Sequence, residues 1–185
     1  MGRLNGEVAT VEALSGSPEA PAGFLQTPHR FDAEPTGIAA PPSTRDAATR
    51  SAISEVPFDQ AWTTELRDAA LAAPQQDPVW RHGDFHTGDL LTTEGRLSAV
   101  IDFGEFGVGD PALGLIIAFT VLSAGTRATL GVGDNAWTRG RGWAPATGLN
   151  AHVHHAAAEP RAAAQTTRQI TQALEGEGPH ASHRS

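Results

Sequence analysis

The chain of 185 residues contains no cysteine and no lysine. Without cysteine it can form no disulfide, no thiolate metal site and no cysteine nucleophile, and its redox compartment is left undetermined. Without lysine it excludes Schiff-base chemistry and the Walker-type phosphate-binding loop, because both depend on a lysine side chain. All 13 of its Lys and Arg residues are arginines. Any mechanism in which this chain itself must supply a lysine is therefore excluded.

Long hydrophobic runs and excess positive charge are also missing. No stretch of roughly 18 or more apolar residues occurs, so no membrane span is expected, and Met1 is not followed by the pattern of a secretory signal. The formal net charge of −8 argues against binding to nucleic acid or to an anionic membrane. We expect a cytoplasmic protein whose partners are cations, metal ions or neutral molecules.

The composition divides the chain into three regions. Residues 1–52 are rich in Ala, Pro, Gly, Ser and Thr, and their apolar side chains occur singly, so an irregular or disordered segment is expected. Residues 53–174 carry apolar patterns that predict one folded domain. Residues 175–185 are expected to be a disordered polar tail. An apolar content of 39% is enough for a single core.

Short strands and several helices are expected within the folded region. Apolar runs and turn residues predict strands at 78–80, 90–93 and 97–101, with a turn at Glu94-Gly95 between the last two. Apolar periodicity predicts helices at 62–71, 112–124, 134–143 and 151–174. Asp110 and Pro111 suit the N-cap and first position of the second helix. The predicted fold class is therefore α+β, mainly helical, with a short β-hairpin.

Three aspartates lie at the ends of these strands, close to glycines. Asp84 and Asp89 belong to the segment His82-Gly-Asp-Phe-His-Thr-Gly-Asp89, and Asp102 ends the apolar run Val100-Ile101. The order strand, loop, strand, turn, strand brings all three to neighbouring loop ends, where carboxylates can hold Mg²⁺ and its phosphates. A lone Asp beside Gly is more often a turn residue that bonds its own backbone, but a charge that ends an apolar strand favours a ligand.

These residues resemble the aminoglycoside phosphotransferase family, whose fold is kinase-like. The resemblance rests on His82-Gly-Asp-x-His-x-Gly-Asp-Leu-Leu, then Val-Ile-Asp102-Phe-Gly, then Gly109-Asp-Pro-Ala, and it covers roughly residues 58–174. It implies the C-terminal (large) lobe of that fold, with the hairpin at the catalytic loop. It also implies ATP- or GTP-dependent, Mg²⁺-assisted phosphoryl transfer to the hydroxyl of a small substrate that can be cationic.

The resemblance implies a role for each motif position. Asp84 matches the catalytic base that accepts the proton of the acceptor hydroxyl. Asp102 matches the carboxylate that holds Mg²⁺, and Asp89 stands where the family has a second metal ligand, normally Asn. His82 and His86 match motif histidines, which we interpret as supports of the loop.

The same resemblance shows what this sequence lacks. The family places a sheet-rich lobe before this region, with a nucleotide-covering loop and a lysine that pairs with the phosphates. Residues 1–52 show neither consecutive strands nor lysine, and single electrostatic elements contribute about 10³–10⁵ in rate to phosphoryl transfer. We therefore expect a truncated kinase fragment that is inactive on its own, or one that docks on a separate chain supplying the missing lobe.

Two other classes remain open. The chain could be a non-catalytic module that binds a cationic ligand or a partner chain. It could also be a metal-dependent hydrolase, because its motif residues offer mixed nitrogen and oxygen ligands: His82, Asp84, His86, Asp89 and Asp102.

Two further groups of residues are interpreted as structural. His152, His154 and His155 do not share one helical face, so a solvated or partly packed cluster is expected. Arg139 and Arg141, with their neighbouring tryptophans, are expected to serve packing and the surface.

Overall fold

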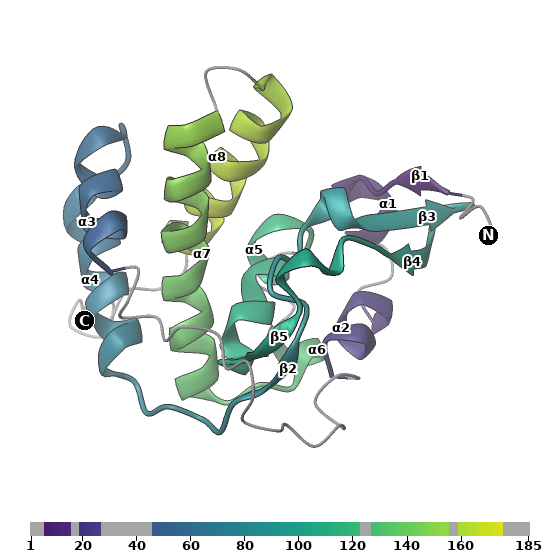
Figure 1. Cartoon of the computed structure of the whole chain (residues 1–185), viewed down its shortest axis with the longest axis horizontal. Helices are drawn as coiled ribbons and strands as arrows, with labels where there is room; N and C mark the ends of the chain where they lie inside the picture. The colour runs from purple at the N-terminus through teal and green to yellow at the C-terminus, as the bar shows by residue number, and fades with distance from the viewer. Residues whose placement is uncertain (1–5, 16–18, 27–45, 123–126, 156–158, 176–185) are drawn as a thin grey trace, which may run out of the picture.

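The computed structural model describes residues 6–15, 19–26, 46–122, 127–155 and 159–175. Two small antiparallel sheets lie beside a group of packed helices (Figure 1). The first sheet has the order β1-β3-β4, and the second pairs β2 with β5. The strands are β1 (Glu7–Val8), β2 (Val79–Arg81), β3 (Leu90–Thr93), β4 (Arg96–Val100) and β5 (Gly107–Gly109).

Helix α7 (Asp134–His155) is the centre of the helical part. It packs against α4 on one side and α8 on another, and also contacts α3 and the 3-10 helix η5. These neighbours span Asp46–Glu55 (α3), Gln60–Ala72 (α4), Pro111–Ile116 (η5) and Pro160–Glu175 (α8). Shorter helices complete the described chain: α1 (Val11–Ser15), α2 (Glu19–Gln26), η3 (Thr87–Asp89), η4 (Phe103–Glu105), α5 (Ile117–Thr120) and α6 (Arg127–Leu130).

The predicted hairpin is confirmed. Leu90 pairs with Val100 and Thr93 with Arg96, and a bulge between Leu91 and Thr92 shifts the register. Glu94 and Gly95 both have positive φ, 52° and 72°, as a two-residue hairpin turn that matches the strand twist requires. The short hairpin therefore holds Asp89, just before β3, and Asp102, shortly after β4, at the same open end, opposite the turn.

The helical predictions are partly wrong in period and in length. The apolar stretch after Asp110 begins as the 3-10 helix η5 and becomes α-helical only at Ile117. Both helix types place residues i and i+3 near one face, so burial alone does not select between them. Helix α7 continues through Pro145 to His155, so it includes the first residues of the helix expected at 151–174, whose larger part forms α8. A proline usually ends a helix, but here Ala70 of α4 packs against Gly142 and Ile170 of α8 packs near Gly148, on either side of Pro145.

Regular structure within residues 1–52 differs from the irregular segment expected there. Strand β1 pairs with β3, while α1, α2 and most of α3 lie in the same range. Among the single apolar side chains that gave no periodicity, Leu14 is buried and Phe24 and Leu25 are partly buried by contacts distant in sequence, whereas Val8 is exposed. The expected polar tail at 176–185 lies outside the described residues.

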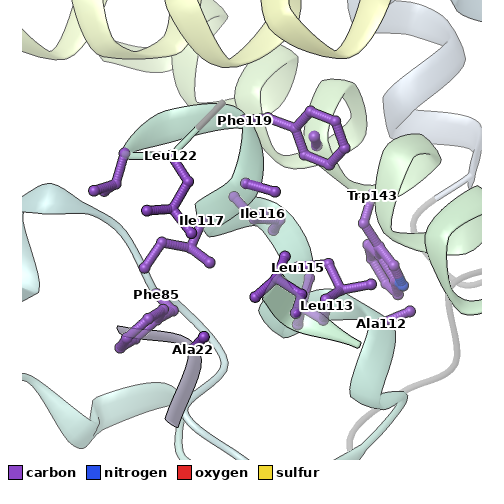
Figure 2. Packing of buried hydrophobic residues seen from close by; sticks show 14 of the residues in the cluster. Ala22, Phe85, Ala112, Leu113, Leu115, Ile116, Ile117, Phe119, Leu122 and Trp143 are labelled. Atoms are coloured by element: carbon purple, nitrogen blue, oxygen red, sulfur yellow. The ribbon is translucent and has the colours of Figure 1, made fainter. Parts of the chain in front are cut away.

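One large apolar cluster joins these elements. Figure 2 shows Phe85 and Ala22 at one end of the cluster, the residues of η5 and α5 in the middle, and Trp143 near the other end. Ile117, Ala118 and Val121 are fully buried, as expected for a stretch that is apolar on every face. The cluster therefore fixes the loop around Phe85 against the helices.

Gly142 allows α4 and α7 to pack closely. A Cβ added there would overlap the Cβ of Ala70 and lie 3.0 Å from the carbonyl oxygen of Leu66. We expect Gly142→Ala to lower the free energy of unfolding by about 1–3 kcal/mol, the usual effect of overpacking. The matched control is Gly23→Ala in α2, where an added Cβ meets nothing within 4 Å and the higher helix propensity of alanine should stabilise by up to about 1 kcal/mol. Chemical denaturation measures both. The same sign for the two variants would contradict the packing argument.

Asp46 joins α3 to α4 through arginines. Its Oδ1 accepts from Arg67 Nε at 2.9 Å and its Oδ2 from Arg50 Nε at 2.8 Å, and Arg67 is almost fully buried. The hydrogen bond from Arg50 lowers the pKa of Asp46 most, and Arg67 adds to this, although partial burial opposes them.

We expect Asp46→Asn to reduce stability at neutral pH by about 1.5–3 kcal/mol, the range for hydrogen bonds to charged groups. Because the pKa of Asp46 is lower in the folded state, its stabilising effect is full above the unfolded-state pKa and disappears as pH falls through the folded-state pKa. The difference from wild type in urea denaturation should therefore shrink in acid. Asp68→Asn is the control, because Asp68 is 59% exposed and should contribute at most about 1 kcal/mol.

Candidate active site

His82 joins the first sequence motif, residues 82–89, to the second, residues 100–104. Its side chain is 3% exposed, and its Nε2 lies 2.9 Å from the carbonyl oxygen of Ile101. Because a carbonyl only accepts, Nε2 carries a hydrogen and donates it. The backbone makes a second link, in which Ile101 N–H donates to the carbonyl oxygen of Asp89 at 2.8 Å. The loop that contains Asp84 is thereby held against the strand that leads to Asp102.

Aromatic rings surround His82 and support the same loop. Phe85 and Phe103 contact the imidazole ring from the two motifs, at centroid distances of 5.6 and 4.9 Å. Phe24 of α2 stacks on Phe85 at 5.2 Å and also touches Phe103. The sequence offered no signal for Phe24, because it lies in a segment without periodicity. Helix α2 is therefore part of the support of the site.

Three side chains of the first motif meet at the end of the loop. Asp84, His86 and Asp89 each offer one ligand atom, and the three atoms lie within 4.8 Å of one another. His86 Nε2 is 3.5 Å from Asp84 Oδ2 and 3.6 Å from Asp89 Oδ2. The side chain of Asp84 is 62% exposed, whereas that of Asp89 is only 8% exposed. The cluster thus combines an accessible carboxylate, Asp84, with a buried one, Asp89.

Burial and neighbouring charge shift the pKa values of this cluster. Burial raises the pKa of Asp89, the nearby carboxylates of Asp84 and Asp102 raise it further, and His86 opposes them. For His86, burial is the largest single influence and lowers the pKa, but Asp84, Asp89 and Asp102 together outweigh it and raise the pKa. The site therefore favours binding of positive charge.

Asp102 lies at the start of η4 in a left-handed conformation, with φ 56° and ψ 67°. Its Oδ1 accepts from the N–H of Gly104 at 3.4 Å. The ligand atoms of Asp84, His86 and Asp89 form a group that does not include Asp102. The Asp102 carboxylate is nevertheless close enough to raise the pKa values of His86 and Asp89. An unusual backbone conformation for a residue other than glycine is common at functional sites.

Asp89 and Asp102 fit a hard divalent cation by their chemistry. Both offer carboxylate oxygens, which Mg²⁺ prefers. Asp89 Oδ2 is buried and has no hydrogen-bond partner among the described residues. A buried carboxylate oxygen without a partner is unfavourable, and a bound cation would compensate for it.

A cavity of about 230 Å³ opens beside Asp84. Its walls carry hydroxyl, amide and carboxylate groups as well as apolar surface, from α3, α7 and both motif loops: Thr49, Gly83, Asp84, Glu105, Trp143, Ala146, Thr147 and Asn150. The two carboxylates, Asp84 and Glu105, make the lining of this cavity negatively charged.

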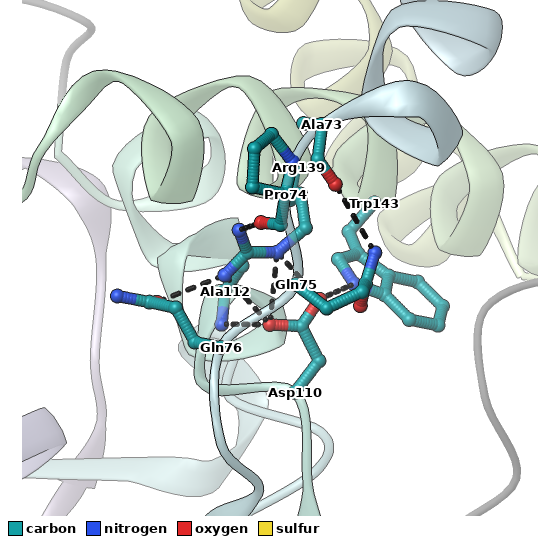
Figure 3. Close-up of polar contacts among 8 residues, drawn as sticks. All are labelled: Ala73, Pro74, Gln75, Gln76, Asp110, Ala112, Arg139 and Trp143. Carbon is teal, nitrogen blue, oxygen red and sulfur yellow. Dashed lines mark hydrogen bonds and ion pairs between the residues drawn. The ribbon is translucent and has the colours of Figure 1, made fainter.

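Asp110 pairs with a buried arginine, Arg139, which the sequence predicted to serve packing and the surface. Arg139 is 1% exposed, and its Nε lies 3.1 Å from Asp110 Oδ2. Figure 3 shows the Asp110 carboxylate between Arg139 and Trp143, whose Nε1 donates to Oδ2 at 3.1 Å. The predicted N-cap is also present, because Oδ1 accepts from Ala112 N at 3.0 Å. Arg139 in turn donates to Gln76 at 2.8 Å and to the carbonyl oxygen of Pro74.

Arg141 and His152, which were also interpreted as structural from the sequence, both contact other parts of the protein. Arg141 is buried and donates to the carbonyl oxygen of Ala173 at 2.7 Å, so it is not at the surface. His152 lies 2.9 Å from Thr166 Oγ1 and contacts the ring of Phe58, which agrees with partial packing.

A model of the phosphotransferase enzyme family matches residues 8–149. The chain belongs to this family. The match includes Asp84, His86, Asp89, Asp102 and Asp110, so the cluster described above lies within the family region. No curated protein matches significantly.

Solved structures show the kinase-like phosphotransferase fold. An aminoglycoside phosphotransferase with GDP and kanamycin has a TM-score of 0.65 at 15% identity, covering 92% of this chain and 68% of that chain. A macrolide 2′-phosphotransferase from Brachybacterium faecium gives 0.53 at 19% identity, covering 92% and 62%. An ethanolamine kinase from Plasmodium vivax gives 0.53 at 12%, covering 92% and 63%. This member of the phosphotransferase family thus spans about two thirds of the length of these structures.

Among the described helices of this phosphotransferase family member, none has both the length and the apolar character needed to cross a membrane.

Proposed function

We propose that the site belongs to a small-molecule kinase, which transfers the terminal phosphoryl group of ATP or GTP to a hydroxyl of a small acceptor. The observation that carries the proposal is Asp84, an exposed carboxylate that lines a polar cavity and lies next to the buried Asp89. Membership of the phosphotransferase family supports it. The similar structures include enzymes that act on macrolides and on ethanolamine and one that binds kanamycin.

Each motif residue has a role in this proposal. Asp84 accepts the proton of the acceptor hydroxyl, since its carboxylate faces the cavity and is accessible. Asp89 and Asp102 would hold Mg²⁺, which neutralises charge on the transferred phosphoryl group when bound. His82 keeps the two motifs together through its bond to Ile101.

The acceptor is proposed to lie in the cavity beside Asp84. Glu105 and Asp84 give this cavity negative charge, while Thr147 and Asn150 add polar atoms to its wall, although both side chains already donate to backbone carbonyls of α7. Such a lining suits an acceptor with several hydroxyl groups and at least one amine, as in aminoglycosides and amino alcohols.

We further propose that residues 53–174 correspond to the large lobe of the kinase-like fold and that the 185 residues alone transfer phosphoryl groups very slowly. The sequence has no lysine to pair with nucleotide phosphates, and single electrostatic elements are worth about 10³–10⁵ in rate. A separate chain that carries a lysine-bearing lobe would be the partner that restores the rate.

The test is transfer from radiolabelled ATP and GTP, with Mg²⁺, to kanamycin, a macrolide and ethanolamine. We expect transfer far below the typical kinase rate of about 1–100 s⁻¹, together with a rise in melting temperature when an accepted ligand binds. Turnover at ordinary kinase rates by the purified chain would overturn the proposed inactivity. If the chain showed no binding and no transfer with any of these nucleotides and acceptors, that result would contradict the kinase site itself.

A second candidate is a binding module without catalysis, favoured by the absence of lysine from a chain that keeps its acidic cavity. It predicts the same melting-temperature rise with a cationic ligand. It also predicts that the rise is independent of nucleotide and Mg²⁺, whereas the kinase site predicts that Mg²⁺ and nucleotide increase it.

A further inference from the structure

The two ring nitrogens of His86 have different partners. Nδ1 accepts a hydrogen bond from the backbone N–H of Gly88 at 3.0 Å, which caps the start of η3. An imidazole nitrogen accepts only when it carries no hydrogen, so the hydrogen of the neutral ring lies on Nε2. The fold of the loop therefore determines which tautomer His86 adopts.

The Nε2 atom of His86 faces two carboxylates. Asp84 Oδ2 is 3.5 Å away and Asp89 Oδ2 is 3.6 Å away. The Asp89 side chain is more than nine-tenths buried, and its Oδ2 has no hydrogen-bond partner in the described part of the chain. Two carboxylates so close repel one another, and an N–H between them offsets part of that repulsion.

We propose that His86 is a positioning residue and not a metal ligand: its Nε2–H lies between Asp84 and Asp89 and holds the Asp84 carboxylate at the edge of the acceptor cavity. A metal on Nε2 would need the lone pair of that nitrogen, and this would move the hydrogen to Nδ1, directly against the N–H of Gly88. The mixed nitrogen and oxygen site of a metal-dependent hydrolase is thereby disfavoured. The role of His86 in positioning a catalytic base rests on the proposed function. The tautomer of His86 and its contact with both carboxylates rest only on the geometry of the loop.

The first test is long-range ¹H–¹⁵N NMR of the full chain with labelled histidine, free of metal and at a pH where His86 is neutral. His86→Gln identifies the His86 signals among the eight histidines. We expect the pattern of the tautomer with hydrogen on Nε2. A hydrogen on Nδ1 would overturn the proposal.

The second test follows the side-chain carboxyl ¹³C resonances of Asp84 and Asp89. In His86→Ala both should shift, because both carboxylates lose the N–H. In His86→Gln both should return toward their wild-type positions, because the glutamine Nε2 can supply an N–H near the same place. His152→Ala, which removes a histidine that contacts Thr166 and Phe58, should shift neither.

Any other pattern overturns the bridging role, including a shift of Asp89 alone or equal shifts in the alanine and glutamine variants. Both tests are independent of phosphoryl transfer. A chain that neither binds a nucleotide or acceptor nor transfers a phosphoryl group would count against the proposed function and leave the result for His86 intact.

Discussion

Replacing Asp110 by asparagine is expected to lower the free energy of unfolding by about 3–5 kcal/mol, the effect of removing one partner from a buried ion pair. Arg139 is 1% exposed and the Asp110 side chain 7% exposed, so water cannot replace the lost charge. The Asp110 carboxylate also accepts from Trp143 Nε1 and Ala112 N. Asparagine offers only one acceptor oxygen for these donors. Urea denaturation followed by tryptophan fluorescence measures the change.

The matched control is Asp134→Asn. Asp134 also pairs with an arginine, Arg127, but its side chain is 93% exposed, and such pairs contribute about 0–1 kcal/mol. A second variant, Asp110→Asn combined with Arg139→Met, removes the uncompensated charge and should recover part of the loss. Equal effects of Asp110→Asn and Asp134→Asn would show that the buried pair contributes no more than a surface one.

Asp84→Asn is expected to reduce Mg²⁺- and ATP-dependent transfer by about 10²–10⁴-fold, the usual contribution of a general base. The expectation applies to whatever rate the site supports, alone or with a lysine-bearing lobe added. Asparagine keeps the shape of the side chain but cannot accept the proton of the acceptor hydroxyl. Single-turnover transfer from γ-labelled ATP measures the change, because it reports the chemical step even when turnover is slow.

Asp77→Asn is the control for this effect. Asp77 is an exposed carboxylate that lines a different cavity, of about 670 Å³, formed in part by α2, η5 and α6. The variant changes the net charge equally and should leave the rate within about twofold of wild type, because exposed charges at a distance are screened. A loss below tenfold in Asp84→Asn would place the catalytic base elsewhere.

Local sequence predicted the part of the site that depends on short-range chemistry. The hairpin from Leu90 to Val100 follows from two short strand-like segments separated by Glu94-Gly95, where glycine favours a turn. The cap at Asp110 follows from the pair Asp-Pro. The motif spacing likewise indicated the phosphotransferase family, which the match over residues 8–149 confirms. The roles of Asp84, Asp89 and Asp102 remain predictions.

The partners of buried polar groups could not be predicted. Arg139 and Asp110 are 29 residues apart, and nothing in the local pattern of either one indicates the other. Phe24 lies in a segment without periodicity, yet it stacks on Phe85 in the loop of Asp84. The continuation of α7 through Pro145 is a similar case, because neighbouring helices outweigh the local preference of proline to end a helix.

The sequence by itself therefore determined which residues are the candidates for the chemistry: three aspartates at strand ends and two motif histidines, in a chain without lysine. Only the tertiary structure decided how they are used. It buries Asp89 while leaving Asp84 accessible, and it sets the hydrogen of His86 on the nitrogen that faces them, through the N–H of Gly88. The physical reason is that residue type and spacing specify local geometry, whereas burial and the choice of hydrogen-bond partner depend on which distant segments pack together.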